Sequence, residues 1–413
     1  MTLAASARSA EEKRELLAEL LLGRHRRLFP TLAHKTYLNY GAQGLLPAPA
    51  LAAMQRFYEE LSAAGPMSIE GSLLVLDELR RTRAALAAEL RAAPERLALV
   101  DNTSMGCNTV LWGLDWQSGD QILLGDHEYP GVAAAVDELA RRRGLAVAPL
   151  PTDAPPDRLL AELAARLTPA TRLLVVSHVA WDTGRVLPLA EVVARCRERG
   201  VRVLVDGAQA VGAMPVDLTA LGADFYAFPG HKWCCGPEGT GGLYVDARAA
   251  ADLHPTLIGP RSLRHDLPDG GRDFHPDARR FETSSSAVAL CAGLRAALEL
   301  HEAWGDREAR WRRIRKLAEQ LWSRLGELEP DLVERLQTEP PETGLVFFRL
   351  RGERGERGQE PERLVRFLEA GGILARSMPQ RRCLRISIHY LTLERDLDRL
   401  LEEVRRFAAP SAG

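Results

Sequence analysis

Between Leu97 and Val245 the sequence alternates short β-rich runs with helical stretches, and this alternation limits the fold more than any other feature. Several runs are apolar nearly throughout, which is typical of parallel strands that helices cover on both faces. The pattern predicts an α/β doubly wound fold with its site at the carboxyl ends of the strands. The predicted strands are LALVD, QILLGD, LAVAPL, RLLVVSH, VRVLVD, ADFYAF and GGLYV.

The rest of the chain predicts a second, smaller unit. With 413 residues, 46% of them hydrophobic, the chain is long enough for two domains. A long helical stretch is predicted after Ser286, through Trp304 to about Leu328, and GLVFFRL, GGILAR and LRISIHY follow as strands of an α+β domain. We therefore expect an N-terminal helix in residues 1–30 that packs on the small domain, a large domain in 31–285 and a small C-terminal domain in 286–413.

Composition excludes several classes of protein. A net charge of −2 provides no basic field for nucleic acid. No apolar run reaches the roughly 18 residues that a membrane span needs, and the N-terminus lacks the pattern of a secretory signal. The cysteines show no C-x-x-C spacing, which favours reduced thiols in a cytoplasmic protein and argues against a metal site or a disulfide framework. They are Cys107, Cys196, Cys234, Cys235, Cys291 and Cys383.

An Asp ends one of the apolar strands, in VRVLVDGAQAVG, and a lone Lys follows some twenty residues later, in AFPGHKWCCGPEGTGGLYV. A buried carboxylate is costly without a partner. Burial of an amine among apolar residues favours its neutral form. The two residues together predict a pocket for a cofactor with an aldehyde and a cationic ring nitrogen, and pyridoxal 5'-phosphate (PLP) is such a cofactor.

Six segments resemble the class V aminotransferase family of fold-type I PLP enzymes, which includes the cysteine desulfurases. Within that family the chain looks most like the L-cysteine/cystine C–S lyases. The resemblance covers roughly Tyr37 to Tyr390 and implies a mainly parallel sheet sandwiched by helices, with a smaller α+β C-terminal domain. The segments are YLNYGAQGLLP, DNTSMGCNTVLWGLDWQSGDQILLGDHEYPG, SHVAWDTGRVLPL, GHKWCCGPEGTGGLYV, RRFETSSS and RRCLRISIHYLT.

The resemblance assigns the catalytic centre to three residues. Lys232 carries the Schiff base with PLP, and Asp206 keeps the pyridine nitrogen protonated, which makes the ring an electron sink. Gln209 hydrogen-bonds the cofactor's phenolate oxygen, and Ala208 supports the ring face. The alternatives are a surface lysine, a helix N-cap for Asp206 and a solvated loop amide for Gln209.

The phosphate of PLP needs donors, preferably at a helix N-terminus. The segment DNTSMGCN opens a predicted helix, so Thr103 and Ser104 are candidates, although simple capping is an alternative. By resemblance His231 also reaches the phosphate, and Ser285 reaches it across the interface of a homodimer. Pro229 stands where many relatives have a hydroxyl residue, so one usual contact is missing or replaced.

Three further residues are expected around the cofactor. Tyr129 stands where relatives place an aromatic ring, often His, over PLP, and a tyrosine there lacks an acid/base group near neutral pH. A tyrosine that merely fills the core is the alternative. His178 and Thr183 follow another buried strand and are expected to line the same crevice.

Substrate binding is expected from two arginines and an N-terminal loop. An amino-acid carboxylate is best bound by a bidentate guanidinium. By resemblance this is Arg385, and Arg376 on the preceding predicted strand is a second cation that suits the second carboxylate of cystine. In isolation, either arginine is more often a surface charge. Asn39 and Gln43 are polar candidates from YLNYGAQGLLP.

The cysteines bear on the reaction. A desulfurase needs a nucleophilic thiol on a flexible loop, and the corresponding segment SMPQRRCL offers only Cys383, which falls inside a predicted strand. The vicinal pair Cys234–Cys235 near the lysine leaves the question open. We therefore expect β-elimination from cystine or cysteine, giving pyruvate, ammonia and a persulfide or sulfide. The alternatives are a cysteine desulfurase, an aminotransferase or epimerase on the same fold, and a catalytically silent binding module.

Overall fold

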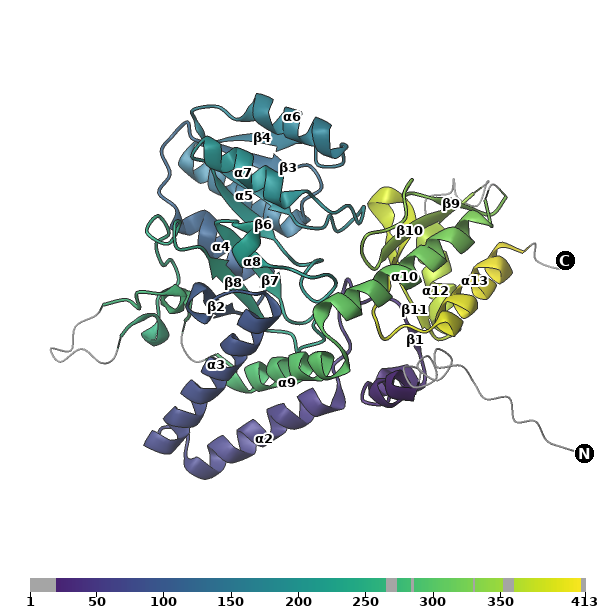
Figure 1. Cartoon of the computed structure of the whole chain (residues 1–413), viewed down its shortest axis with the longest axis horizontal. Helices are drawn as coiled ribbons and strands as arrows, with labels where there is room; N and C mark the ends of the chain where they lie inside the picture. The colour runs from purple at the N-terminus through teal and green to yellow at the C-terminus, as the bar shows by residue number, and fades with distance from the viewer. Residues whose placement is uncertain (1–19, 265–272, 284–285, 330, 352–359, 410–413) are drawn as a thin grey trace, which may run out of the picture.

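The computed structural model describes residues 20–264, 273–283, 286–329, 331–351 and 360–409. It has two lobes, one built on a seven-stranded sheet and one on a four-stranded sheet, with the helices α2, α3 and α9 beneath the first (Figure 1). Among the described helices none combines the length and the apolarity that crossing a membrane requires.

The large sheet confirms the predicted α/β class and all seven predicted strands. Its order is β2-β8-β7-β6-β5-β3-β4, and β8 alone runs antiparallel to its neighbours. The carboxyl ends of the other strands therefore meet at one edge. The strands are β2 (Leu97–Val100), β3 (Gln121–Gly125), β4 (Ala146–Leu150), β5 (Thr171–Ser177), β6 (Arg202–Asp206), β7 (Phe225–Pro229) and β8 (Gly241–Val245).

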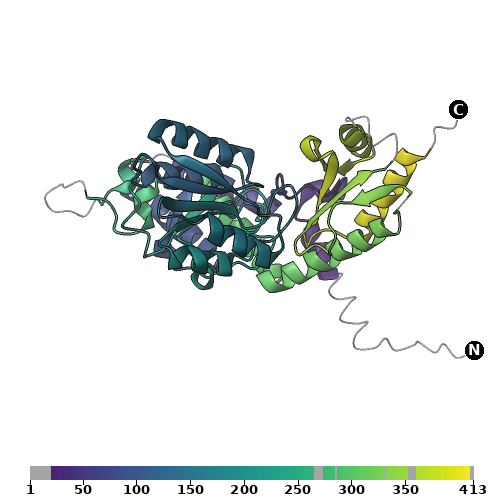
Figure 2. The same ribbon diagram turned by 90° about the horizontal axis from the view of Figure 1, so that it is seen from above.

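Helices cover both faces of this sheet (Figure 2). Alternate residues of β5 enter different cores: Leu174 and Val176 pack with α6 and α7, whereas Leu173 and Val175 pack with α4 and α5. Apolar residues at every position of the strand are thus used on both sides. The helices are α4 (Thr103–Gly113), α5 (Pro130–Arg143), α6 (Pro156–Arg166), α7 (Leu189–Glu198) and α8 (Leu218–Leu221).

The small sheet is antiparallel, in the order β12-β13-β10-β9, and α10, α12 and α13 pack on it. A separate parallel pair joins β1, near the N-terminus, to β11. The strands of the small sheet are β9 (Val333–Arg335), β10 (Leu345–Leu350), β12 (Arg376–Met378) and β13 (Cys383–Ser387). The separate pair consists of β1 (Thr36–Tyr37) and β11 (Ile373–Leu374). The helices are α10 (Arg307–Gly326), α12 (Glu360–Ala370) and α13 (Glu394–Ala408).

The long helix expected after Ser286 is two helices, α9 (Val288–Trp304) and α10. The break occurs because Asp306 adopts an extended conformation and its side chain caps α10, accepting a hydrogen bond from Ala309 N at 2.7 Å. The helix α9 packs with α2 (Ala48–Ala64) and α3 (Ile69–Glu89) rather than on the small sheet. The division of the chain into domains at residue 286 stays a prediction.

The described part of the N-terminal segment contacts the lobe that is built on the four-stranded sheet. Residues 20–26 are helical, and Arg26 forms a buried ion pair with Asp396 of α13 at 3.2 Å. His25 donates to or accepts from the Tyr390 hydroxyl at 2.8 Å. The expected N-terminal helix of residues 1–30 lies outside the described residues up to position 19.

Candidate active site

A cavity of about 280 Å³ opens at the carboxyl ends of β5, β6 and β7, next to the N-terminus of α4. This is where an open α/β sheet is expected to bind a ligand. Most of the predicted cofactor residues line it. The lining residues are Asn102, Thr103, Ser104, Tyr129, Ser177, Val179, Trp181, Asp206, Ala208, Gln209, Pro229, His231 and Lys232.

Asp206 and Lys232 face the cavity with opposed electrostatics. Asp206 ends β6 and is buried, and desolvation raises the pKa of its carboxyl although the nearby Lys232 opposes that shift. The pKa of Lys232 is lowered to about 8, chiefly by desolvation, with Arg385 and Arg376 adding to the shift and Asp206 opposing it. The amine is therefore poised near neutral pH, where a lysine can act as nucleophile and base.

Glu128 is a buried acid at the site that the sequence reasoning missed. Its carboxyl oxygens accept hydrogen bonds from Ser177 N at 2.6 Å and Ser177 Oγ at 2.8 Å. Burial, followed by the charge of Asp206, raises the pKa of Glu128 to about 8. No local pattern announces this acid, because it follows β3 in a polar turn and is buried only when β5 packs beside that strand.

The donors predicted for the phosphate lie together. The Asn102 side chain caps α4 through Met105 N at 2.9 Å, which leaves Thr103 and Ser104 in the first turn beside the cavity. His231 Nδ1 is buried and has no hydrogen-bond partner within the described chain. An unpaired buried nitrogen next to a helix N-terminus fits an anion. Ser285 lies outside the described residues.

Aromatic rings form one wall of the cavity. Lys232 Nζ lies 5.9 Å from the centroid of the Tyr129 ring, and Tyr129 meets Trp181 edge-on at 5.8 Å. Tyr129 is 46% exposed, so its ring is open to the cavity rather than buried in the core. The tyrosine therefore has the position expected for stacking on a planar cofactor.

Gln209, His178 and Thr183 have surroundings that the sequence did not indicate. Gln209 donates from Nε2 to Gly41 O at 2.8 Å and accepts from Trp233 Nε1 at 3.0 Å, while lining the cavity. His178 bonds the Tyr226 hydroxyl through Nδ1 at 2.8 Å and does not line the cavity. Thr183 lines a neighbouring cavity instead. The cofactor roles of His178 and Thr183 stay predictions.

The predicted carboxylate arginines lie opposite each other on adjacent strands. Arg385 of β13 pairs in register with Arg376 of β12, so both side chains project from the same face of the sheet. Arg385 is 2% exposed, it donates from Nη1 to Trp181 O at 3.0 Å, and no described residue provides a partner for its Nε. Burial, together with the charge of Arg376, lowers the pKa of Arg385 to about 10.

The N-terminal loop is adjacent to β13. Asn39 forms an isolated bridge with Ser387, and its buried Oδ1 has no partner within the described chain. Gln43 accepts a hydrogen bond at its backbone oxygen from the Tyr37 hydroxyl at 2.7 Å. Asn39 therefore retains a free acceptor near Arg385, whereas only the backbone of Gln43 is fixed.

All six cysteines are unpaired and lie within the described part of the chain. Five are buried and Cys291 is half-buried. Cys383 is fully buried at the start of β13, as the sequence predicted, and burial raises the pKa of its thiol to about 11. Burial also raises the pKa of Cys235 to about 12. None of the six has the exposure and low pKa of a nucleophilic thiol.

These residues fit PLP. A buried acid and a lysine with a lowered pKa share a cavity with an aromatic ring, and the unpaired His231 Nδ1 lies at its phosphate side. An anion site at one end and a carboxylate opposite an amine at the other match the cofactor's phosphate, ring nitrogen and aldehyde.

Comparison with known proteins gives consistent relatives. The family model for aminotransferase class-V matches residues 36–401. The cystine C-S lyase C-DES, solved in complex with its reaction product cysteine persulfide, is 40% identical, with a TM-score of 0.85 over 91% of this chain and 98% of that one. The isopenicillin N epimerase of Amycolatopsis lactamdurans is 32% identical over 395 residues, 90% of this chain and 95% of that protein. A probable cysteine desulfurase of Methanothermobacter thermautotrophicus is 27% identical over 399 residues, 93% of this chain and 97% of that protein.

Proposed function

The chain belongs to the PLP-dependent class V aminotransferase family, and on that premise we propose that it is a carbon–sulfur lyase that cleaves cystine by β-elimination. The observation that carries the proposal is that Lys232 and Asp206 line one cavity and that two facing arginines lie close enough to lower the pKa of Lys232, while none of the six thiols has the exposure and low pKa of a nucleophile. The likeness to a cystine C-S lyase over most of both chains supports the same reaction.

Lys232 and Asp206 carry out the proton transfers of the proposed reaction. When bound, PLP supplies a ring that withdraws electrons from the Cα of an attached amino acid. Asp206 holds a proton at the ring nitrogen. Lys232 would hold the cofactor through its aldehyde, and the free Lys232 Nζ would take the proton from Cα of the bound substrate. A pKa of about 8 leaves part of the amine free at neutral pH for this step.

The other residues orient the reactants. Thr103, Ser104 and His231, which line the cavity, would bind the phosphate, and Tyr129 would cover the ring. Arg385 binds the α-carboxylate, with its free Nε available for the second bond of a bidentate pair. As the Cα proton leaves, the C–S bond at Cβ breaks. Cystine and water then give pyruvate, ammonia and cysteine persulfide, which balances all atoms.

The arginine pair favours cystine over cysteine as the substrate. Cystine has a carboxylate at each end, and Arg376 provides a second cation on the same face as Arg385. Arg376 is exposed, so it is accessible to the far end of a longer substrate. Cysteine has no group for this second cation.

A cysteine desulfurase is the main alternative. Its reaction transfers sulfur to an enzyme thiol and releases alanine, so it requires an accessible cysteine near the substrate. Cys383 is the thiol of the segment between Arg376 and Arg385, and it is buried in β13. An epimerase is a second alternative because of the epimerase relatives. It would return the Cα proton without losing sulfur.

A homodimer with a shared site and a cytoplasmic location complete the proposal. Ile69, Leu73 and Leu76 form an exposed apolar stripe on α3, and Met67 beside them is 94% exposed. A stripe of this kind is expected to be covered by a second copy. Light scattering should give twice the chain mass, and a monomer that is fully active would contradict the shared site. The unpaired thiols support a reducing compartment.

The test of the reaction is a product assay. Purified holoenzyme is incubated with cystine, and pyruvate, alanine and persulfide are measured, with Cys383→Ser as the matched variant. Equal pyruvate formation by both proteins supports the lyase. Alanine together with a protein-bound persulfide that disappears in the variant would establish the desulfurase instead. Deuterium exchange at Cα without sulfur release would establish an epimerase.

A further inference from the structure

The loop that carries Lys232 is held through its backbone carbonyls. Four consecutive carbonyl oxygens accept hydrogen bonds. His231 O accepts from Gly44 N at 2.7 Å, and Lys232 O accepts from Cys235 N at 3.0 Å. The next two oxygens bond imidazole rings. His389 Nε2 lies 3.2 Å from Trp233 O, and His301 Nε2 lies 2.9 Å from Cys234 O.

These bonds determine the protonation of a buried chain of side chains. A carbonyl only accepts, so His301 Nε2 carries a proton and its Nδ1 presents a lone pair. The Tyr390 hydroxyl, 2.5 Å away, must donate to that lone pair. The same hydroxyl oxygen then accepts from His25 Nε2 at 2.8 Å. The chain from His25 through Tyr390 and His301 to Cys234 O is therefore complete with neutral rings.

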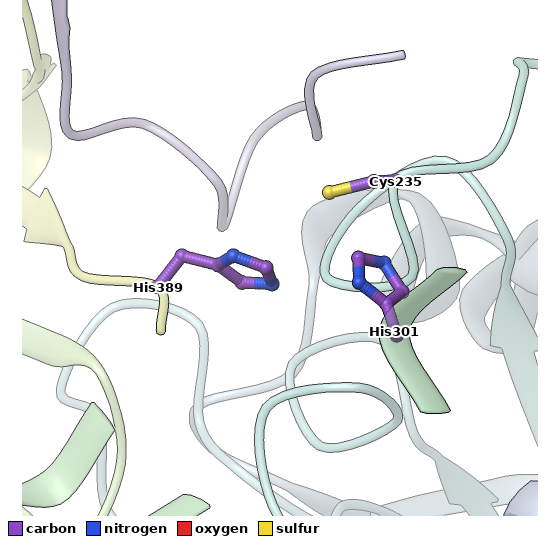
Figure 3. A group of neighbouring side chains, drawn as sticks. All are labelled: Cys235, His301 and His389. Carbon is purple, nitrogen blue, oxygen red and sulfur yellow. The ribbon is translucent and has the colours of Figure 1, made fainter. Parts of the chain in front are cut away.

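A metal site is the competing explanation of this cluster. Cys235, His301 and His389 are buried, and one potential ligand atom of each lies within 4.8 Å of the others (Figure 3). Zinc needs ring lone pairs and a thiolate. However, Tyr390 occupies the lone pair of His301, and both Nε2 atoms carry protons toward carbonyls. The Cys235 thiol is also protonated, since burial raises its pKa to about 12. The observed bonds favour a metal-free cluster.

The loop needs such support because its backbone is strained. Cys235 has a φ of 52°, which is unfavourable for a residue with a side chain. Its amide closes the turn onto Lys232 O, and the carbonyl before it is the one that His301 binds. The strained turn is thus fixed on both sides, within three residues of the reactive amine.

His389 also connects the lysine loop to the substrate arginine. It lies four residues after Arg385, just beyond the end of β13, while Trp233 is the direct neighbour of Lys232. Its ring stacks on Tyr40 at 4.4 Å, and Tyr40 follows the substrate-loop residue Asn39. One ring therefore contacts the segments that hold the lysine, the arginine and the N-terminal loop.

We propose that His301 and His389 are positioning residues, which hold the backbone of the lysine loop at a fixed distance from Arg385 so that one substrate can meet both groups. The inference rests on the roles proposed for Lys232 and Arg385. Neither histidine contacts the substrate. They act through the carbonyls of Trp233 and Cys234, as neutral donors from α9 and from the segment after β13.

The test compares two substitutions of His389 in the holoenzyme. His389→Phe keeps a flat ring on Tyr40 but leaves Trp233 O without its donor, whereas His389→Gln keeps an N–H donor near the position of Nε2. We expect His389→Phe to lower kcat/KM by about 10- to 100-fold, with both a lower kcat and a higher KM, because small displacements of reacting groups are costly. His389→Gln should recover most of this loss.

A readout without substrate separates this inference from the proposed reaction. The visible absorption of the bound cofactor, and the pH at which it changes, should shift in His389→Phe and return toward wild type in His389→Gln. If wild type releases no pyruvate from cystine but the spectra differ as expected, the reaction is wrong and the positioning role stands. If pyruvate forms and both variants match wild type in spectrum and kinetics, the positioning role is wrong.

Two further variants distinguish the positioning role from a folding defect. Tyr390→Phe removes only the hydroxyl that supports His301, and it should show a smaller change of the same kind with its thermal midpoint nearly retained. His34→Phe, at an exposed position, is the control and should behave as wild type. Wild-type behaviour of Tyr390→Phe, or an equal loss in both His389 variants, contradicts the inference. So does stoichiometric zinc in the holoenzyme whose removal abolishes activity.

Discussion

The two sides of the Lys232 loop, the cavity side and the far side that holds His301 and His389, differ in charge and in hydrogen bonding. The cavity side is charged, with Asp206 and Arg385 buried and Lys232 half-buried, and polar atoms such as His231 Nδ1 and Arg385 Nε find no partner among the described residues. On the far side the rings of His301 and His389 are neutral, and apart from His389 Nδ1 and the Tyr40 hydroxyl the polar atoms that face the loop bond one another or the loop. Unpaired charge marks the place where a ligand completes the structure, whereas satisfied neutral rings mark a support.

The largest expected effect comes from removing the amine of Lys232 on the cavity side. Lys232→Ala should lower turnover by about 10²- to 10⁴-fold or more, because the nucleophile and the base are lost together. Borohydride reduction of the holoenzyme followed by peptide mass analysis should find an adduct at position 232 in wild type only. The exposed Lys35→Ala serves as the control. An adduct at another lysine would contradict the assignment.

Replacing the buried cation on the cavity side is expected to have the next largest effect. Arg385→Gln should raise KM for cystine by about 10- to 100-fold, which corresponds to the loss of a charge-assisted hydrogen bond. Arg385→Lys retains the charge without the planar fork and should recover only part of the affinity. Steady-state kinetics check this, with thermal midpoints to exclude unfolding. An unchanged KM would place the carboxylate elsewhere.

Acid should weaken the neutral far side. Burial lowers the pKa of His389, on the far side, to about 3, and it lowers that of His178, which lies against Tyr226 in the large lobe, to about 4, from an ordinary value of 6.5. The unfolded chain therefore binds protons that the folded chain does not, so stability is full above pH 6.5 and falls as the pH drops toward 4. Each ring costs roughly 3 kcal/mol at pH 4. The thermal midpoint of the apoprotein should fall over this range, and less steeply in His389→Phe. A constant midpoint would argue against neutral buried rings.

The smallest expected effect concerns the influence of Arg376 on the pKa of Lys232. The positive charge of Arg376 lowers the pKa of Lys232, so Arg376→Gln should raise it. The acidic limb of the kcat profile, which reports the enzyme–substrate complex in which Lys232 is the free base, should then move to higher pH by less than about one unit, because Arg376 is solvent-exposed and screened. A pH series on both proteins measures the shift. A movement to lower pH would contradict the sign.

The sequence predicted the cavity side well and the far side hardly at all. Asp206 and Lys232 follow apolar strands, and a strand end in a parallel sheet is a position with a known location. The sequence also predicts Cys383 inside a strand, and it is the first residue of β13. In contrast, the helix predicted across Gly305 is two helices, since the capping geometry of Asp306 outweighs the continuous helical pattern. Glu128 gave no signal, because its burial depends on the neighbouring strand.

Local order along the chain, which is the alternation of strands with helices and the types of residue at strand ends, was sufficient to predict the sheet and to place Asp206 and Lys232 at its edge. Only the tertiary structure decided which side chains meet behind the lysine. His25 and Tyr390 are 365 positions apart in the sequence, and His301 contacts the Lys232 loop from α9. Such contacts arise from packing between distant segments, which the period of a single helix or strand does not encode.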